Sequence, residues 1–155
     1  MSLKDAFPPA YQEQHVRKNL VPGTVIRFEA RMDDGEIQPK RFVVLDSSDN
    51  TLTVVINSDL NAILKARDLL VCQVTMPVSQ HPFMKRDSNI DCSRVRAYDT
   101  EELVRQLVAT PDWLLGSISE DTRNQMLAAL KQSRTESPQV IRACCRNLEA
   151  IPPAH

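Results

Sequence analysis

The fold is decided by residues 24–56, which read TVIRFEARMDDGEIQPKRFVVLDSSDNTLTVVI. At their start, Ile26 and Phe28 alternate with charged residues, and this period of two is typical of a half-buried strand. Residues 41–45 and 52–56 are two further apolar, β-rich runs on either side of a polar turn. Parallel strands need crossovers of about a dozen or more residues, and these runs are too close together for that. The stretch therefore predicts three antiparallel strands.

Two more strands are expected after the first three. Residues 69–75 and 89–95 are β-rich runs, and a loop over residues 77–86 separates them. A tight turn is expected at residues 33–35, where Asp-Asp-Gly ends in a glycine that tolerates a positive φ. Several short strands in so little chain predict a mainly β domain, a strongly curved antiparallel barrel that extends from residue 23 to 95.

The hydrophobic period becomes helical after Tyr98. Asp99, Ser119 and Ser137 are the expected N-caps of successive helices, because each supplies a side-chain acceptor just before an apolar stripe. Pro111 is expected to end the first of these helices. We expect the helices to pack on the barrel.

The chain is expected to divide into three parts. Residues 1–20 contain adjacent prolines and no clean period, and they predict an arm or one short helix. Residues 21–134 are expected to form the barrel domain with its packed helices, and residues 135–155 a C-terminal helix and tail. A length of 155 residues suits one compact domain with such appendages.

Composition excludes several classes of protein. With 19 basic and 20 acidic residues and a net charge of −1, the chain has no global basic field for coating duplex nucleic acid, although a local basic groove stays compatible. Its 3 glycines make no phosphate-binding loop, and its 4 cysteines have no metal-ligand spacing. We find no bilayer-spanning run and no leader pattern. We expect a cytoplasmic protein with reduced thiols and no metal, cofactor or membrane partner.

Four short motifs follow one another in a definite order. The strand that starts at Pro22-Gly23 is followed by residues 40–46 (KRFVVLD), 53–58 (TVVINS) and 84–90 (MKRDSNI). In this order the chain resembles the MazF/PemK family of toxin ribonucleases, from about residue 22 to residue 130. The resemblance implies a small SH3-like barrel with helices, usually a homodimer. Such a protein cleaves single-stranded RNA without a metal or cofactor and is inhibited by an antitoxin protein.

The resemblance also implies the residues of an active site. RNA supplies its own nucleophile, the 2′-hydroxyl, so the protein needs a positioning or proton-accepting group and a cation for the charge developing on the phosphate. Arg41 matches the family's strand arginine, and its planar, always charged guanidinium suits the second task, although a surface arginine at a strand start is the alternative. Asn57 and Ser58 stand where the family commonly has a threonine followed by a serine. His81 is either a proton-transfer group or a solvated loop histidine.

Contacts to the RNA backbone are expected from four basic residues: Arg27, Lys40, Lys85 and Arg86. A strand-entry turn is the alternative for the segment that contains the last two. Trp113 is expected to anchor the helices to the barrel rather than to stack on a base. Two functions stay open: a metal-independent endoribonuclease, and a catalytically inactive toxin-like barrel that serves as an RNA- or protein-binding regulatory module.

Overall fold

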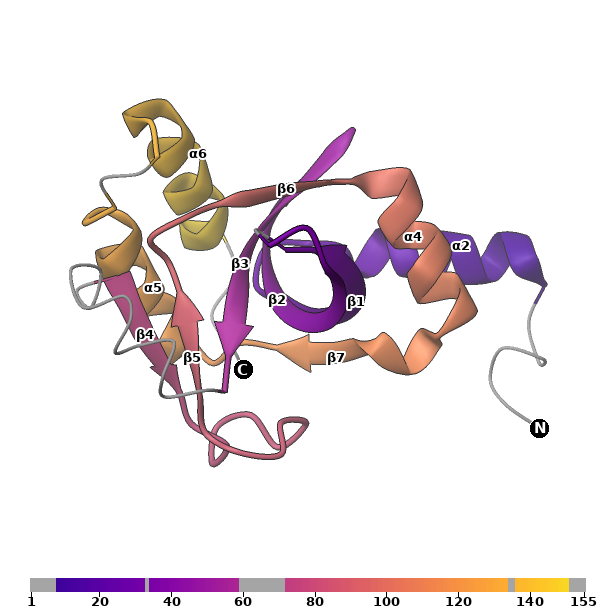
Figure 1. Ribbon diagram of the computed structural model, residues 1–155, viewed down its shortest axis with the longest axis horizontal. Coiled ribbons are helices and arrows are strands. Elements are labelled where there is room, and N and C mark those ends of the chain that lie inside the picture. The colour runs from indigo at the N-terminus through magenta and orange to yellow at the C-terminus, as the bar shows by residue number, and fades with distance from the viewer. Residues whose placement is uncertain (1–7, 33, 59–71, 134–135, 151–155) are drawn as a thin grey trace.

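The computed structural model describes residues 8–32, 34–58, 72–133 and 136–150. Within these residues, the protein consists of a seven-stranded antiparallel sheet and four α-helices (Figure 1). The elements are α2 (Pro9–Asn19), β1 (Thr24–Arg31), β2 (Ile37–Ser47), β3 (Asn50–Asn57), β4 (Gln73–Met76), β5 (Ser88–Asp91), β6 (Arg96–Asp99), α4 (Thr100–Ala109), the 3-10 turn η2 (Pro111–Trp113), β7 (Leu114–Ser117), α5 (Glu120–Leu130) and α6 (Pro138–Glu149).

The sheet has the strand order β4-β5-β3-β2-β1-β7, and β6 pairs with β3 outside this path. Every pairing is antiparallel, as the sequence predicts. β1 and β2 curl strongly in the middle of the molecule (Figure 1). No pairing within the described ranges joins β4 to β7, so the hydrogen-bonded ladder is not closed into a barrel there.

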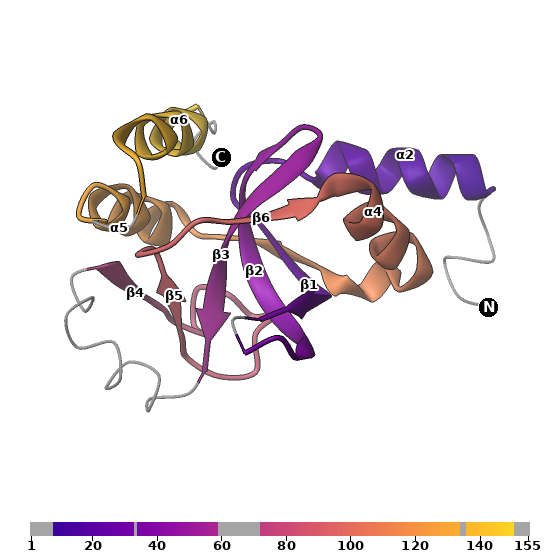
Figure 2. The same ribbon diagram turned by 45° about the horizontal axis from the view of Figure 1, so that its top comes forward.

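β2 separates two hydrophobic cores. Alternate side chains of a strand point to opposite faces, and here both faces are covered. Phe42 and Val44 belong to a core that includes residues of β1, α2 and α4, whereas Val43 and Leu45 belong to a core that includes residues of α5 and α6. All four side chains are completely buried, which explains why the strand is a continuous apolar run. Figure 2 shows the two helix pairs at opposite ends of the molecule.

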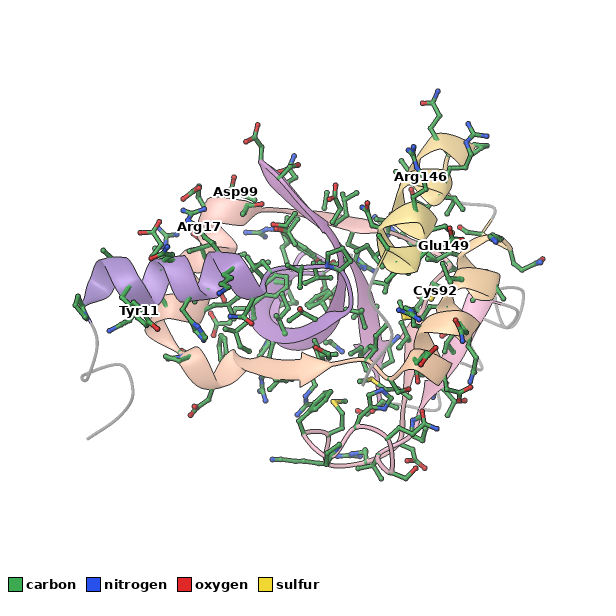
Figure 3. The ribbon with its side chains drawn as sticks, turned by 180° about the vertical axis from the view of Figure 1, so that it is seen from behind. Tyr11, Arg17, Cys92, Asp99, Arg146 and Glu149 are labelled. Carbon is green, nitrogen blue, oxygen red and sulfur yellow. The ribbon has the colours of Figure 1, made fainter. Side chains whose placement is uncertain are left out.

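The N-terminal segment is a helix that is integrated into the fold. Val16 and Leu20 are buried in the same core as the apolar face of α4. Arg17 on α2 donates a hydrogen bond to Glu101 on α4 at 2.6 Å and another to Glu13 at 2.7 Å. Figure 3 shows Arg17 beside the start of α4, near Asp99. Of the two predicted alternatives for residues 1–20, the short helix is correct for residues 9–19.

All three expected helix caps are confirmed. Asp99 accepts the backbone N–H of Glu102 through a carboxylate oxygen at 3.0 Å. Ser119 accepts the N–H of Thr122 at 3.1 Å, and Ser137 caps α6 in the same way. A side-chain acceptor at this position satisfies an N–H that has no partner within the helix.

The sequence prediction differs from the structure at four strands. The expected strand over residues 69–75 is observed as β4, and its first residues lie outside the described part of the chain. The expected strand over residues 89–95 ends at Asp91, because the Asp91 carboxylate accepts the N–H of Ser93 at 3.0 Å and forms a turn. β6 and β7 were not predicted.

No helix in the described ranges is both long and apolar enough to cross a bilayer. All four cysteines have free thiols, and all four are buried.

Candidate anion-binding site

Two arginines face each other directly across β1 and β2. Arg27 is the register partner of Arg41, two residues along from the partners Val25 and Val43. The two arginines therefore share a face of the sheet. Directly opposed residues of antiparallel strands generally have Cβ atoms about 4.5–5.5 Å apart. The next partner of Arg41, on β3, is the buried Ile56. The pair thus lies at the edge of the hydrophobic core that contains Val25, Val43 and Ile56.

A docked loop brings a third arginine toward this pair. Residues 77–87 leave the lower ends of β4 and β5 and pass below β7 (Figure 1). The ring of Phe83 packs so closely on Gly116 of β7 that a Cβ there would lie 2.5 Å from it. Asp87 closes the loop by accepting the N–H of Val78 at 2.8 Å. These contacts hold the part of the loop that carries Arg86.

Arg41 lies within the electrostatic influence of both Arg27 and Arg86. Partial burial lowers the pKa of the Arg41 guanidinium, and the positive charges of Arg27 and Arg86 lower it further. Arginine nevertheless stays charged at physiological pH, because its ordinary pKa is very high. We refer to Arg27, Arg41 and Arg86 as the arginine cluster.

No negative charge of the described residues neutralises the arginine cluster. No carboxylate in residues 8–32, 34–58, 72–133 or 136–150 forms an ion pair with any of its members. The Nε atoms of Arg27 and Arg41 are buried without a hydrogen-bond partner. Their terminal nitrogens make no hydrogen bond to any described residue, and they are not among the buried atoms, so they reach solvent. The guanidinium groups therefore have unused donors on an accessible surface.

Trp113 adjoins the cluster. It is the last residue of η2, directly before β7, whose Leu114 pairs with Ile26 of β1. The half-buried indole packs against the core under α2 and α4, as expected for an anchoring residue. The guanidinium carbon of Arg27 lies over the ring at 5.9 Å from its centroid.

His81 is not the solvated loop histidine that was one of the two expectations, because it is buried and holds the loop in place. Its side chain is completely buried. Nε2 accepts the backbone N–H of Ser119 at 3.0 Å, so the ring hydrogen lies on Nδ1, which donates to the carbonyl of Pro77 at 2.8 Å. Proton transfer by His81 would require the ring to leave both hydrogen bonds. These bonds instead tie the loop to the start of α5.

The other predicted site residues do not join the arginine cluster. Asn57 follows Ile56, the β3 partner of Arg41, so its side chain belongs to the opposite face of the sheet. Lys40 belongs to that opposite face too, because it precedes Arg41. Ser58 is exposed directly after β3, and Lys85 is exposed in the loop. The structure thus brings Arg27, Arg41 and Arg86 together. It places Asn57, which was predicted to work with Arg41, on the other face of the sheet.

The arrangement suits a phosphate group. Planar guanidinium groups match pairs of phosphate oxygens, and clustered arginines are typical of anion recognition. The described residues contain no group of three or more His, Cys, Asp or Glu side chains that could hold a metal ion. No protein-family model matches the chain, and no curated protein matches it.

Proposed function

We propose that the chain binds single-stranded RNA through its phosphates at the arginine cluster. The observation that carries the proposal is the directly opposed pair Arg27 and Arg41, with Arg86 beside it and no carboxylate of the described residues paired to any of them. Like charges at opposed sheet positions destabilise the pair. A bound phosphate removes this repulsion and satisfies the unused donors, so the cost to the fold is consistent with selection for binding.

The proposal includes the MazF/PemK-like character of the chain. The strong curl of β1 and β2 and the short antiparallel strands support an SH3-like barrel (Figure 1). A homodimer and an antitoxin protein as regulator belong to the same proposal. Sedimentation that gives only a species of 17.5 kDa at micromolar concentration would exclude the homodimer.

Fluorescence anisotropy with a labelled single-stranded RNA of mixed sequence tests the binding. Arg41→Ala is expected to weaken binding by about 10- to 100-fold, because a hydrogen bond to a charged group contributes about 1.5–3 kcal/mol. Arg146→Ala is the control, since Arg146 is exposed on α6 (Figure 3) and is expected to have no effect. The proposal fails if the two variants bind alike, or if inorganic polyphosphate of equal charge competes as well as RNA does.

Cleavage of the RNA is the second candidate function. The partial burial of Arg41 favours this function. Its positive charge is partly shielded from water, and no carboxylate of the described residues pairs with it. Such a charge stabilises the phosphorane formed by attack of the 2′-hydroxyl. Ser58 is the exposed hydroxyl at the end of β3 that this candidate assigns to positioning the RNA.

Incubation with long single-stranded RNA in chelator, followed by end-group analysis for a cyclic phosphate, tests cleavage. If wild-type protein cleaves, Arg41→Ala is expected to slow the reaction by about 10²- to 10³-fold. Asn57→Thr, which restores the family's hydroxyl on the opposite face, is expected to leave the rate unchanged. Binding without any cyclic phosphate would leave the non-catalytic RNA-binding module as the function.

A further inference from the structure

Arg27 and Arg41 have different surroundings, although they face each other across the sheet. Arg27 lies over the indole of Trp113, at 5.9 Å from the ring centroid. Arg41 has no contact with an aromatic ring of the described residues, and it lies toward Ile56 and the charge of Arg86. Contact with an aromatic ring restricts where a guanidinium can move, whereas an arginine without such contact can follow a phosphate.

Trp113 gives Arg27 a rigid support. The indole is fixed from behind, because it packs against the core under α2 and α4. Pairing of Leu114 with Ile26 fixes the backbone on both sides of the contact. The terminal nitrogens of Arg27 are not buried and have no hydrogen-bond partner in the described part of the chain. The guanidinium carbon therefore lies over the indole, and the terminal nitrogens reach solvent.

We propose that Arg27, held on Trp113, is a stacking platform for one RNA base, beside a phosphate held by Arg41 and Arg86. The inference rests on the proposed RNA binding and divides the arginine cluster into a base-stacking part and a phosphate-binding part. Guanidinium planes and aromatic rings are the usual platforms for unstacked bases of single-stranded RNA. Every base has an aromatic face, so the platform accepts any base and makes binding depend on the presence of bases.

Two probes separate base stacking from phosphate binding: a single-stranded RNA, and the same ribose-phosphate backbone without bases. Arg27→Lys keeps the charge and removes the planar group. It is expected to weaken binding of RNA by about 5- to 150-fold, the loss that corresponds to one base stack, and to weaken binding of the abasic strand much less, because lysine keeps the positive charge. Arg41→Lys is the matched variant, and it is expected to weaken both probes equally.

Trp113 supplies a second readout, because it is the one tryptophan of the chain. Its fluorescence is expected to change when RNA binds and to stay constant when the abasic strand binds. The platform is excluded if Arg27→Lys binds RNA like wild type, if it loses equal affinity for both probes, or if the abasic strand changes the fluorescence equally. If wild-type protein binds neither probe, the proposed RNA binding itself fails, and the platform fails with it.

Discussion

Replacing Arg41 by methionine is expected to stabilise the fold and to weaken anion binding in the same step. Arg41 faces Arg27 directly, and removing such a like-charge pair contributes about 0.2–1 kcal/mol. Its buried Nε has no partner, which costs about 1–3 kcal/mol in a fully buried site and less at this half-buried one. Methionine keeps an unbranched apolar chain beside Ile56. We expect the free energy of unfolding to rise by about 1–2 kcal/mol.

Thermal unfolding measures this change, with Arg146→Met as the control on the exposed surface of α6. A protein of this length gains about 2–4 °C in Tm for each kcal/mol, so Arg41→Met is expected to unfold about 2–8 °C higher than wild type. Added RNA is expected to raise the Tm of wild type, because it binds only the native state, and to raise the Tm of the variant much less. A lower Tm for Arg41→Met would refute the reasoning, because it would mean that the guanidinium makes a stabilising contact.

Two further substitutions test the contacts that hold the loop of residues 77–87, and one labelling experiment tests the burial of a cysteine. His81→Ala is expected to lower the free energy of unfolding by about 1–3 kcal/mol, because the N–H of Ser119 loses its acceptor; an unchanged denaturation midpoint would argue against the structural role. Gly116→Ala is expected to cost about 1–3 kcal/mol, because its Cβ would lie 2.5 Å from the Phe83 ring, and to weaken RNA binding by displacing the loop. If Tm and RNA affinity both stay at wild-type values, the loop is held by other contacts. Burial raises the pKa of the Cys144 thiol to about 11, so iodoacetamide at neutral pH is expected to label Cys144 only after unfolding. Mass spectrometry that finds Cys144 labelled in the native protein would contradict this.

The elements that were predicted correctly are those with a strong local signal. The three N-caps stand before clear apolar stripes, and the run over residues 42–45 is buried on both faces. β6 and β7 were missed because they are short and depend on distant partners. Arg96–Asp99 is a strand because it pairs with β3, and Leu114–Ser117 is a strand because it pairs with the start of β1. Neither segment has a period of its own that distinguishes a strand from a connection.

The candidate site was predicted in part for the same reason. Strand alternation places Arg27 and Arg41 on one face once the register is known, and it places Asn57 on the other. The sequence contains the residues but not the register, so the prediction placed Asn57 in one active site with Arg41 and assigned Arg27 only to contacts with the RNA backbone. The burial of His81 depends on a hydrogen bond to Ser119, 38 positions further along the chain. Gly116 follows two leucines in the sequence, and only the three-dimensional structure shows its close contact with Phe83.

The salt dependence of RNA binding tests the arginine cluster most directly. Each phosphate contact to a single strand contributes about −0.7 to the slope of log K against log salt concentration. The slope for Arg41→Met is therefore expected to be less steep than that for wild type by about 0.7, and the slope for Arg146→Met is expected to equal that for wild type. Equal slopes for all three proteins would contradict the account, because they would mean that Arg41 contacts no phosphate.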